Sequence, residues 1–379
     1  MPTAAGALLG PRPAAWPMRR PSDLSDAAFE LAQRSEIADL HLDSYIAARV
    51  FGYDLRRHHG LGPLGGRFFG QLDWPRALSG GLTLGMWSLT TNPFRSAGGR
   101  WRAFERNLDD FQSQIERFGP ALRVVRDCGE LDAARADGSH AVLLAIQGGN
   151  ALEAAPGGVA DLPRGLIWRV TLVHLTNATY GPTSSPLGLW RRSDPLPAAG
   201  RSLVQALNEA RILVDVAHLG HRAVRDVAAC HDPSLPLVAT HTGVSGVTPH
   251  WRNLDDEELR LIAASDGVVG VIYQAGFLRR PGGPAGVEMV VEHLDHLRRT
   301  IGVRHCAIGS DYDGAIMPPV DVRDGAVGYL RLIDTLLRAG WRDEEVQAVL
   351  AGNTLRVLRA LRPAGWAAGA AVASATAAR

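Results

Sequence analysis

Short apolar runs that alternate with longer segments of helical periodicity limit most strongly how this 379-residue chain can fold. Eight of these runs are rich in Val, Ile, Leu and Thr, which favours β-strands. They span residues 37–43, 82–91, 141–147, 168–174, 212–218, 237–241, 267–273 and 306–311. Their nearly continuous hydrophobicity is typical of parallel strands that are covered on both faces. Such strand–helix repeats predict an α/β fold of the (β/α)8 TIM-barrel type.

The segments between the runs supply the predicted helices and domain boundaries. Helical periodicity indicates helices at residues 100–118, 201–210, 255–264, 288–299 and 327–339. Residues 51–76, rich in Gly and Arg, form a long insertion after the first strand that could cover the mouth of the barrel. We therefore predict a barrel domain over residues 36–360, an N-terminal extension at 1–35 and a flexible Ala-rich tail at 361–379.

The composition argues against several other classes of protein. The formal net charge is +1 and opposite charges are interspersed, so neither a nucleic acid nor an anionic membrane is indicated as a partner. No stretch is apolar enough to insert into a membrane, and the N-terminus lacks the basic start of a signal peptide, so we expect a cytoplasmic protein. Cys128, Cys230 and Cys306 lie far apart and outside any CxxC pair, which favours reduced thiols over disulfides or a zinc ribbon.

Polar side chains gather where the predicted strands end. These residues are His41, Asp43, Gln147, His174, His218, His241 and Asp311. Barrel enzymes build their active sites at the carboxyl ends of the strands. Each histidine alone would be interpreted as a buried core residue, but so many on one rim indicate a functional site.

Four of the strand ends carry side chains that suit a metal ion. His41 and Asp43 lie two residues apart in an extended segment, so both point to the same face. The fifth and sixth strands end in VDVAH and VATH, which supply His218 and His241, and the eighth ends in IGSDYDG. Neutral imidazole and carboxylate are good zinc ligands. Asp311 is either a ligand or the proton acceptor for a metal-bound water.

The order and spacing of these pieces resemble the membrane dipeptidase (renal dipeptidase) family, a branch of the amidohydrolase superfamily. The similarity covers about residues 36–358. The matching pieces are the HLD of the first strand, the GG after the third, His174, the VDVAH and ATH histidines, Arg252-Asn253, IGSDYDG and Gly352-Asn353. The resemblance implies a metal-dependent hydrolase that cleaves small dipeptides.

The resemblance also implies how the metal-binding residues divide their roles. His41 and Asp43 would bind one Zn2+, and His218 and His241 would bind a second. Asp311 would serve the catalytic water. In hydrolysis by this constellation, Asp311 would take a proton from the metal-bound water, whose hydroxide would attack the carbonyl, and Asp311 would then pass the proton to the leaving amine.

The chain departs from the family pattern at Gln147, where the family usually has a glutamate that bridges two metals. An amide offers one neutral oxygen, and its NH2 cannot coordinate, so Gln147 is a doubtful ligand. The chain has no lysine to replace the bridge, and Glu153 lies six residues beyond the strand end. Two outcomes stay open. One is a binuclear site held mainly by a bridging hydroxide, and the other is a single metal on His41, Asp43 and Asp311, with or without a later histidine.

The residues expected to hold the substrate also follow from the resemblance. His174 would contact the substrate carbonyl and stabilise the oxyanion, and Arg252 would bind the terminal carboxylate of the dipeptide. Tyr273 is a weaker candidate for the pocket wall, because an aromatic residue at a strand end is more often part of the packing. Such dipeptidases often accept D-residues at the second position, and dimers are common in the family.

Two other functions stay open from the sequence. The same barrel and ligands serve enzymes that act on other small amides or lactones, because only the loops distinguish their substrates. Alternatively, Gln147 supports a catalytically silent, metal-poor relative that binds a small ligand. Retention of the remaining ligands favours the dipeptidase.

Overall fold

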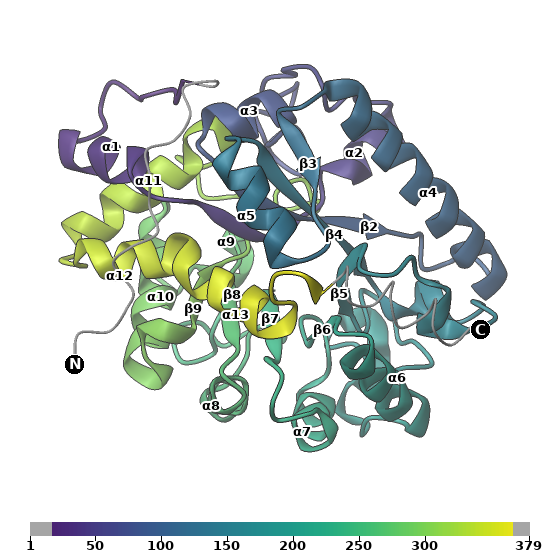
Figure 1. Cartoon of the computed structure of the whole chain (residues 1–379). Coiled ribbons are helices and arrows are strands. Elements are labelled where there is room, and N and C mark those ends of the chain that lie inside the picture. Colours follow the sequence, from purple (N-terminus) through teal and green to yellow (C-terminus); the bar gives the residue numbers. More distant parts are fainter. Residues whose placement is uncertain (1–16, 367–379) are drawn as a thin grey trace.

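Eight parallel strands form a nearly closed barrel in the computed structural model, which describes residues 17–366 (Figure 1). In order around the barrel they are β1 (Ala38–Leu42), β2 (Leu84–Thr90), β4 (His140–Gln147), β5 (Ile167–Thr171), β6 (Leu213–Asp215), β7 (Val238–Thr242), β8 (Val268–Val271) and β9 (Cys306–Ile308). Between β9 and β1, the amide of Asp311 donates to the carbonyl of His41 at 3.0 Å and the amide of Asp43 to the carbonyl of Tyr312 at 2.9 Å. The predicted (β/α)8 barrel is confirmed.

The strands differ from the predicted runs mainly at their carboxyl ends. β6 ends at Asp215 and β9 at Ile308, whereas the apolar runs continue to His218 and Asp311. Val216 is buried although it lies beyond the strand, so hydrophobicity did not mark the point where strand pairing stops. An additional strand, β3 (Leu122–Val124), pairs with the start of β4 and was not predicted, because three residues show no recognisable period.

Helices surround the barrel (Figure 1). The five predicted helices are α4 (Ala97–Phe118), α6 (Ala198–Glu209), α8 (Asp256–Ala264), α10 (Glu288–Ile301) and α11 (Gly325–Arg338). Their ends agree with the predicted ones to within about three residues, because most carry clear caps. At the start of α8, Asp255 and Glu258 form a capping box, in which each side chain accepts from the other residue's backbone amide.

Eight further helices among residues 17–366 were not predicted. They are α1 (Asp26–Gln33), α2 (Ser44–Phe51), α3 (Trp74–Ser79), α5 (Cys128–Ala136), α7 (His221–Cys230), α9 (Ala275–Leu278), α12 (Asp343–Gln347) and α13 (Asn353–Leu361). Short 3-10 turns lie at η1 (Gly149–Leu152), η2 (Gly158–Asp161), η3 (Pro186–Ser193) and η4 (Val303–His305), and a π-helical turn at η5 (Ala348–Gly352). Most of these elements span fewer than three helical turns, but α7 and α13 are as long as the predicted α8, so length alone does not explain why they were not predicted.

The two ends of the described chain pack against the barrel domain. The hydroxyl of Ser25 donates to Oδ1 of Asp334 on α11 at 2.6 Å, which attaches the start of α1. At the other end Arg362 is buried, and its Nη1 donates to the carbonyl of Gly165 at 2.6 Å. The predicted division into residues 1–35, 36–360 and 361–379 stays a prediction, and residues 1–16 and 367–379, including most of the predicted tail, lie outside the described residues.

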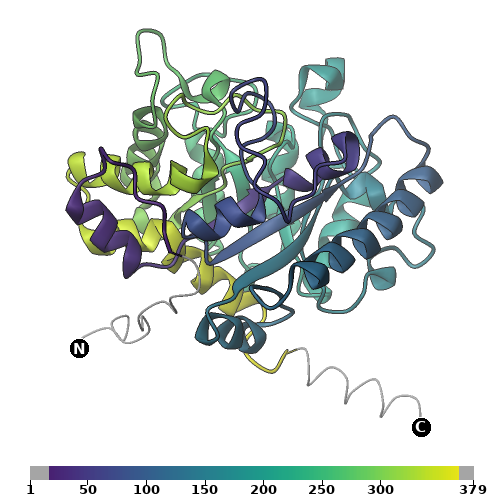
Figure 2. The same ribbon diagram turned by 90° about the horizontal axis from the view of Figure 1, so that it is seen from above.

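The long insertion after the first strand lies at the carboxyl end of the barrel, beside the loop that follows β9 (Figure 2). The amide of Phe68 donates to the carbonyl of Ile316 at 2.7 Å. Asp313 holds the end of the insertion, because its carboxylate accepts from the amides of Gln71 (2.8 Å) and Leu72 (3.1 Å). The same carboxylate accepts from the hydroxyl of Ser44 (2.5 Å), just before the insertion. The insertion is therefore held over one side of the barrel mouth.

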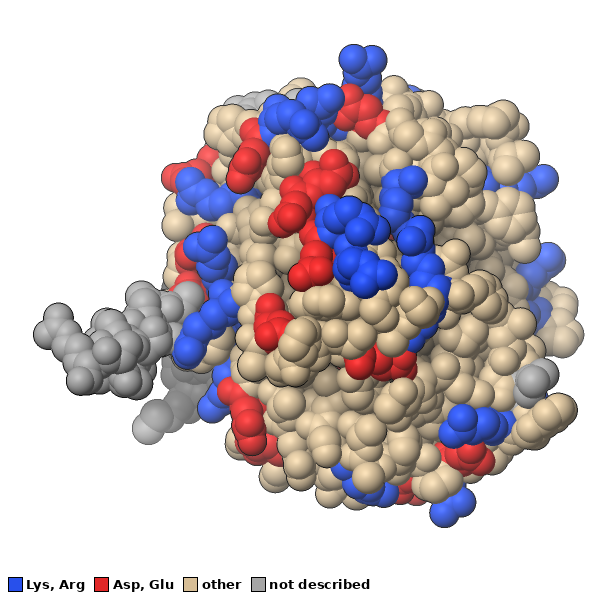
Figure 3. All heavy atoms as spheres, turned by 90° about the vertical axis from the view of Figure 1, so that its right-hand side faces the viewer, with Lys and Arg blue, Asp and Glu red and all other residues tan. Residues whose placement is uncertain are grey.

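Arginine side chains on the surface lie next to aspartates and glutamates on the face shown in Figure 3. Among residues 17–366, none of the helices combines the length and the apolar character needed to cross a bilayer.

Candidate metal centre

The strand ends bring the five predicted ligands, His41, Asp43, His218, His241 and Asp311, into one buried cluster. Nε2 of His41 lies 3.6 Å from Oδ2 of Asp43 and 3.6 Å from Oδ1 of Asp311. Nε2 of His218 and Nε2 of His241 lie 2.9 Å apart. His41, His241 and Asp311 each offer one ligand atom within 4.8 Å of the others. These side chains share one site, and their individual roles stay predictions.

Two members of the cluster have an unusual backbone conformation. His218 has a φ of 67° and Asp311 a φ of 61°, in the left-handed region that residues other than glycine rarely adopt. Both conformations are held by hydrogen bonds. The amide of Ser184 donates to the carbonyl of His218 at 2.7 Å, and the amide of Asp311 donates to the carbonyl of His41. Strained residues of this kind concentrate at functional sites.

His241 is oriented by a chain of hydrogen bonds that ends on Asp215. The hydroxyl of Thr240 donates to Oδ2 of Asp215 at 2.6 Å, so its oxygen accepts the hydrogen on Nδ1 of His241, 2.9 Å away. This arrangement leaves an unprotonated Nε2 on His241, directed at His218. Outer partners of this kind orient metal-bound histidines and increase their basicity.

Gln147, the last residue of β4, contacts the His41–Asp43 side of the cluster. With its amide nitrogen toward Asp43, Nε2 donates to Oδ2 of Asp43 at 2.7 Å and to Oγ1 of Thr90 at 2.8 Å, while Oε1 accepts from Nε2 of His41 at 3.2 Å. The opposite orientation would place the amide oxygen 2.7 Å from a carboxylate oxygen. The partners of an amide decide its orientation, and here they favour the first arrangement.

Arg169, on β5, lies inside the barrel behind the cluster and was not among the predicted site residues. Its Nη2 is 3.0 Å from Nδ1 of His41 and donates to the hydroxyl of Ser88 at 2.7 Å. Its Nη1 donates to the carbonyl of Ile146 at 3.2 Å and lies 3.4 Å from Oδ2 of Asp215. The sequence did contain a signal for this residue, namely an arginine inside an apolar strand. A fully buried charge must be paired, so such an arginine indicates polar partners inside the barrel.

The electrostatics of the cluster suit a divalent cation. Burial lowers the pKa of His41, His218 and His241, so these imidazoles are neutral near pH 7, as metal binding requires. Burial and the Asp43 carboxylate raise the pKa of Asp311 well above its usual value. In the described part of the chain, Oδ1 of Asp311 has no hydrogen-bond partner. An unpaired carboxylate oxygen beside imidazole nitrogens fits a metal ion, which supplies the missing partner.

Two of the predicted substrate residues lie close to this cluster. The ring of His174 packs edge-on against His218, with centroids 4.7 Å apart, and loss of hydration lowers its pKa to about 4. Arg252 is buried, and its Nη2 donates to the carbonyl of His241 at 2.6 Å. Neither Nδ1 of His174 nor Nε of Arg252 has a hydrogen-bond partner within residues 17–366. The third candidate, Tyr273, is fully buried and packs edge-on against Tyr312 at 5.5 Å, as a packing residue does.

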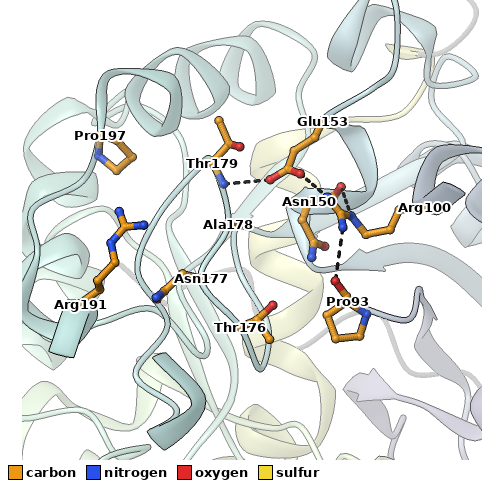
Figure 4. Close-up of a pocket in the computed structure, with 10 residues that line it drawn as sticks. All are labelled: Pro93, Arg100, Asn150, Glu153, Thr176, Asn177, Ala178, Thr179, Arg191 and Pro197. Atoms are coloured by element: carbon orange, nitrogen blue, oxygen red, sulfur yellow. Dashed lines mark hydrogen bonds and ion pairs between the residues drawn. The ribbon is translucent and has the colours of Figure 1, made fainter. Parts of the chain in front are cut away.

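A cavity of about 360 Å³ lies at the same end of the barrel, between the loops that follow β2, β4 and β5 (Figure 4). It is lined by Pro93, Arg100, Asn150, Glu153, Thr176, Asn177, Ala178, Thr179, Arg191 and Pro197. Glu153 accepts from the amide of Thr179 at 2.8 Å and forms an ion pair with Arg100. Its carboxylate is thus engaged in the cavity wall, which supports the expectation that Glu153 does not replace the missing bridge.

A barrel that gathers histidines and carboxylates at the carboxyl ends of its strands is typical of metal-dependent hydrolases. The chain belongs to the membrane dipeptidase family (peptidase family M19), whose model matches residues 25–366. This finding confirms the resemblance inferred from the motifs.

Similar proteins include two curated relatives and a solved structure. An uncharacterized protein in the pqqA 5′ region of Klebsiella pneumoniae is 38% identical over 167 residues, 43% of this chain and 60% of that protein. Dipeptidase verJ of Clonostachys rogersoniana is 28% identical over 259 residues, 68% of this chain and 64% of that protein. The chain thus matches less than two thirds of either relative. The crystal structure of dipeptidase AC, a metallo peptidase, is 26% identical with a TM-score of 0.74, covering 87% of this chain and 99% of that one.

Proposed function

We propose that this protein is a metal-dependent dipeptidase that hydrolyses the peptide bond of small dipeptides. The observation that carries the proposal is the buried cluster in which Nε2 of His218 and Nε2 of His241 face each other at 2.9 Å beside the unpaired Oδ1 of Asp311. Two imidazole nitrogens this close repel each other unless a hydrogen or a cation lies between them. Membership of a dipeptidase family supports the same function.

The proposed cofactor is Zn2+, with one ion or two in each chain. His41, Asp43, His218, His241 and Asp311 are the candidate ligands, and Gln147 stays the doubtful one because its oxygen already accepts from His41. A bound divalent ion would polarise the substrate carbonyl and make a water molecule acidic enough to act as a nucleophile near neutral pH.

Asp311 and His174 are the proposed catalytic residues. Oδ1 of Asp311 has no hydrogen-bond partner among residues 17–366, and the pKa of this residue is raised, so its carboxylate is basic enough to take a proton from water and pass it to the leaving amine. The neutral ring of His174 has an unpartnered Nδ1, and a hydrogen on this ring would be available to stabilise the oxyanion.

Arg252 is the proposed binding residue for the terminal carboxylate of the dipeptide. One arm of its guanidinium is fixed by the carbonyl of His241, which holds the charge at the cluster, while Nε is free of protein partners in the described residues. A planar guanidinium held in this way is well suited to a carboxylate. We also propose that the enzyme accepts dipeptides with a D-residue at the C-terminal position.

One observation favours a second candidate, a metal-poor relative that binds a small ligand without turnover. The hydrogen bonds of Gln147 to Asp43 and His41 satisfy part of the cluster with no ion present. Oδ1 of Asp311 and Nδ1 of His218 speak for the enzyme, because neither has a hydrogen-bond partner among residues 17–366.

Metal analysis combined with a dipeptide assay tests the proposal. The purified protein is stripped with a chelator, reloaded with Zn2+, Mn2+ or Co2+, and assayed with Ala-Ala and with L-Ala-D-Ala. We expect at least one tightly bound ion per chain and hydrolysis that depends on it. Less than one ion per chain and no turnover with any of the three metals would exclude the dipeptidase and favour the silent relative. A cytoplasmic location and a homodimer stay predictions from the sequence.

A further inference from the structure

We propose that Arg169 and Gln147 together close the His41–Asp43 half of the centre to a metal, so that the chain holds a single ion at His218, His241 and Asp311. This inference rests on the proposed function only in requiring that the centre binds a metal. It differs from the single-metal arrangement that the sequence left open, in which the ion lies on His41, Asp43 and Asp311, with or without a later histidine.

Arg169 decides which nitrogen of His41 carries hydrogen. A guanidinium has only donors, so at 3.0 Å from Nη2 of Arg169, Nδ1 of His41 must accept. A neutral imidazole has one hydrogen, which then lies on Nε2. Nε2 is the nitrogen that faces Asp43 and Asp311, and with a hydrogen attached it has no lone pair for a metal. Metal-bound histidines normally donate from their second nitrogen to a carboxylate or carbonyl, the reverse of what Arg169 imposes.

Gln147 is oriented to accept from the same tautomer of His41, the one with hydrogen on Nε2. Its Oε1 lies 3.2 Å from Nε2 of His41 and accepts the hydrogen that Arg169 has placed there. Its Nε2 donates to both carboxylate oxygens of Asp43, at 2.7 and 3.2 Å. A glutamate at this position would offer two acceptors and repel Asp43. Arg169, His41, Gln147 and Asp43 therefore form a hydrogen-bonded chain in which each donor that faces the next residue meets an acceptor.

Arg169 cannot easily turn away from His41, because partners inside the barrel hold both of its terminal nitrogens. Besides Ser88, Ile146 and Asp215, its Nη1 also donates to the hydroxyl of Thr171. Its side chain is fully buried. The positive charge is thus fixed behind His41, where it also opposes a second divalent cation.

In His241 the hydrogen lies on the other ring nitrogen than in His41. Nδ1 of His241 donates to Thr240, which leaves a lone pair on Nε2. Nε2 of His218 lies 2.9 Å from this nitrogen. Asp311 and His41 also offer ligand atoms within 4.8 Å of one on His241, but on His41 the nitrogen that faces the cluster carries hydrogen. Within residues 17–366, Nδ1 of His218 and Oδ1 of Asp311 have no hydrogen-bond partner, so this half of the cluster is the less satisfied one.

Zinc stoichiometry in four proteins tests this assignment. The native protein, Gln147→Glu, Arg169→Gln and the double variant are reloaded with Zn2+, freed of loosely bound metal by gel filtration, and measured by elemental mass spectrometry. We expect one ion per chain in the native protein and in each single variant, and two in the double variant. Two ions in the native protein or in Gln147→Glu alone, or one ion in a folded double variant, would overturn the assignment. Two ions in the native protein would overturn the assignment but leave the proposed dipeptidase function intact. No bound ion in the native protein would contradict both the assignment and the proposed function.

The tautomer of His41 provides a second test that needs no change at Arg169. Imidazole 15N shifts of the native protein are recorded before and after Zn2+ addition, with the His41 signals assigned from a His41→Gln spectrum. We expect Nε2 of His41 to carry hydrogen in both states, while the Nε2 signals of His218 and His241 move on binding. Loss of the hydrogen from Nε2 of His41 when Zn2+ binds would show that His41 is a ligand and refute the inference.

Discussion

Arg169 and Asp215 form an ion pair inside the barrel, with Nη1 of Arg169 3.4 Å from Oδ2 of Asp215 and both side chains fully buried. Burial alone would raise the pKa of Asp215, but Arg169 and the hydrogen bonds from Thr240 and Thr171 hold it below its usual value. The pair links the metal centre to the core, because Arg169 contacts His41 and Asp215 orients His241 through Thr240.

Removal of Arg169 alone should destabilise the fold. An Arg169→Met variant leaves the Asp215 carboxylate buried without its countercharge, which costs about 3–5 kcal/mol of unfolding free energy. Urea unfolding of the native protein and the variant measures this difference. The double variant Arg169→Met/Asp215→Asn should recover part of the loss. A single variant as stable as the native protein would show that the ion pair is not needed to hold Asp215 in the barrel.

Thr240 should affect metal affinity without touching the metal. In Thr240→Val, Nδ1 of His241 loses its acceptor, and the loss of such an outer partner weakens metal binding about 10–100-fold. Zn2+ affinity is measured by competition with a chelating dye. Thr248→Val is the matched control, since its buried hydroxyl donates to the carbonyl of Leu278 at 2.6 Å, outside the cluster. Equal affinities in the two variants would argue against the Thr240–His241 link.

Arg252 should matter for substrates with a free carboxylate. Arg252→Met removes a charge-assisted interaction worth about 1.5–3 kcal/mol, so kcat/KM for a dipeptide should fall about 10–150-fold, mostly through KM. The corresponding dipeptide amide is the control substrate, because it has no carboxylate to lose. Metal content is measured in parallel, since Arg252 also donates to the carbonyl of His241. An equal loss with both substrates would mean that Arg252 does not bind the carboxylate.

His221 should make stability depend on pH near neutrality. Its Nδ1 lies 2.9 Å from both carboxylate oxygens of the buried Glu258, and this hydrogen bond raises the pKa of His221 despite burial and the nearby Arg225, with Asp255 adding to the rise.

A raised folded pKa stabilises the protein below the unfolded value of about 6.5, and the stabilisation is lost as the pH rises through the folded value. The native protein should therefore be more stable than His221→Gln by a larger difference in unfolding free energy at pH 5.5 than at pH 8.5. The difference stays below about 1 kcal/mol, because the side chain is 43% exposed. His305→Gln is the control, because the ring of His305 contacts the backbone carbonyl of Gly267 rather than a carboxylate. A difference that grows with pH would contradict the argument.

The barrel and the cluster could be predicted because their signals are local. A strand covered on both faces shows as an apolar run, and the residues after each run face one rim, so His41, His218, His241 and Asp311 could be grouped without knowledge of their distances. The carboxyl ends of the strands could not be placed, because the loop residue Val216 is as buried as its strand neighbours.

The role of Arg169 could not be predicted, because its partners come from other strands. His41, Ser88 and Asp215 lie on β1, β2 and β6, and only the closed barrel brings them to one guanidinium. For the same reason Gln147 could be recognised as unusual, but the direction of its amide could not be inferred. That direction depends on the carboxylate of Asp43 and on the hydrogen that Arg169 places on His41, and both partners lie on other strands or loops.

The most direct test of the central claim is the dipeptide turnover of zinc-loaded native protein against zinc-loaded Asp311→Asn, at metal contents shown to be equal. A metal-dependent dipeptidase in which Asp311 transfers the proton predicts measurable hydrolysis by the native protein and a kcat about 10²–10⁴-fold lower in the variant. No hydrolysis by fully loaded native protein, or an undiminished kcat in the variant, would contradict it.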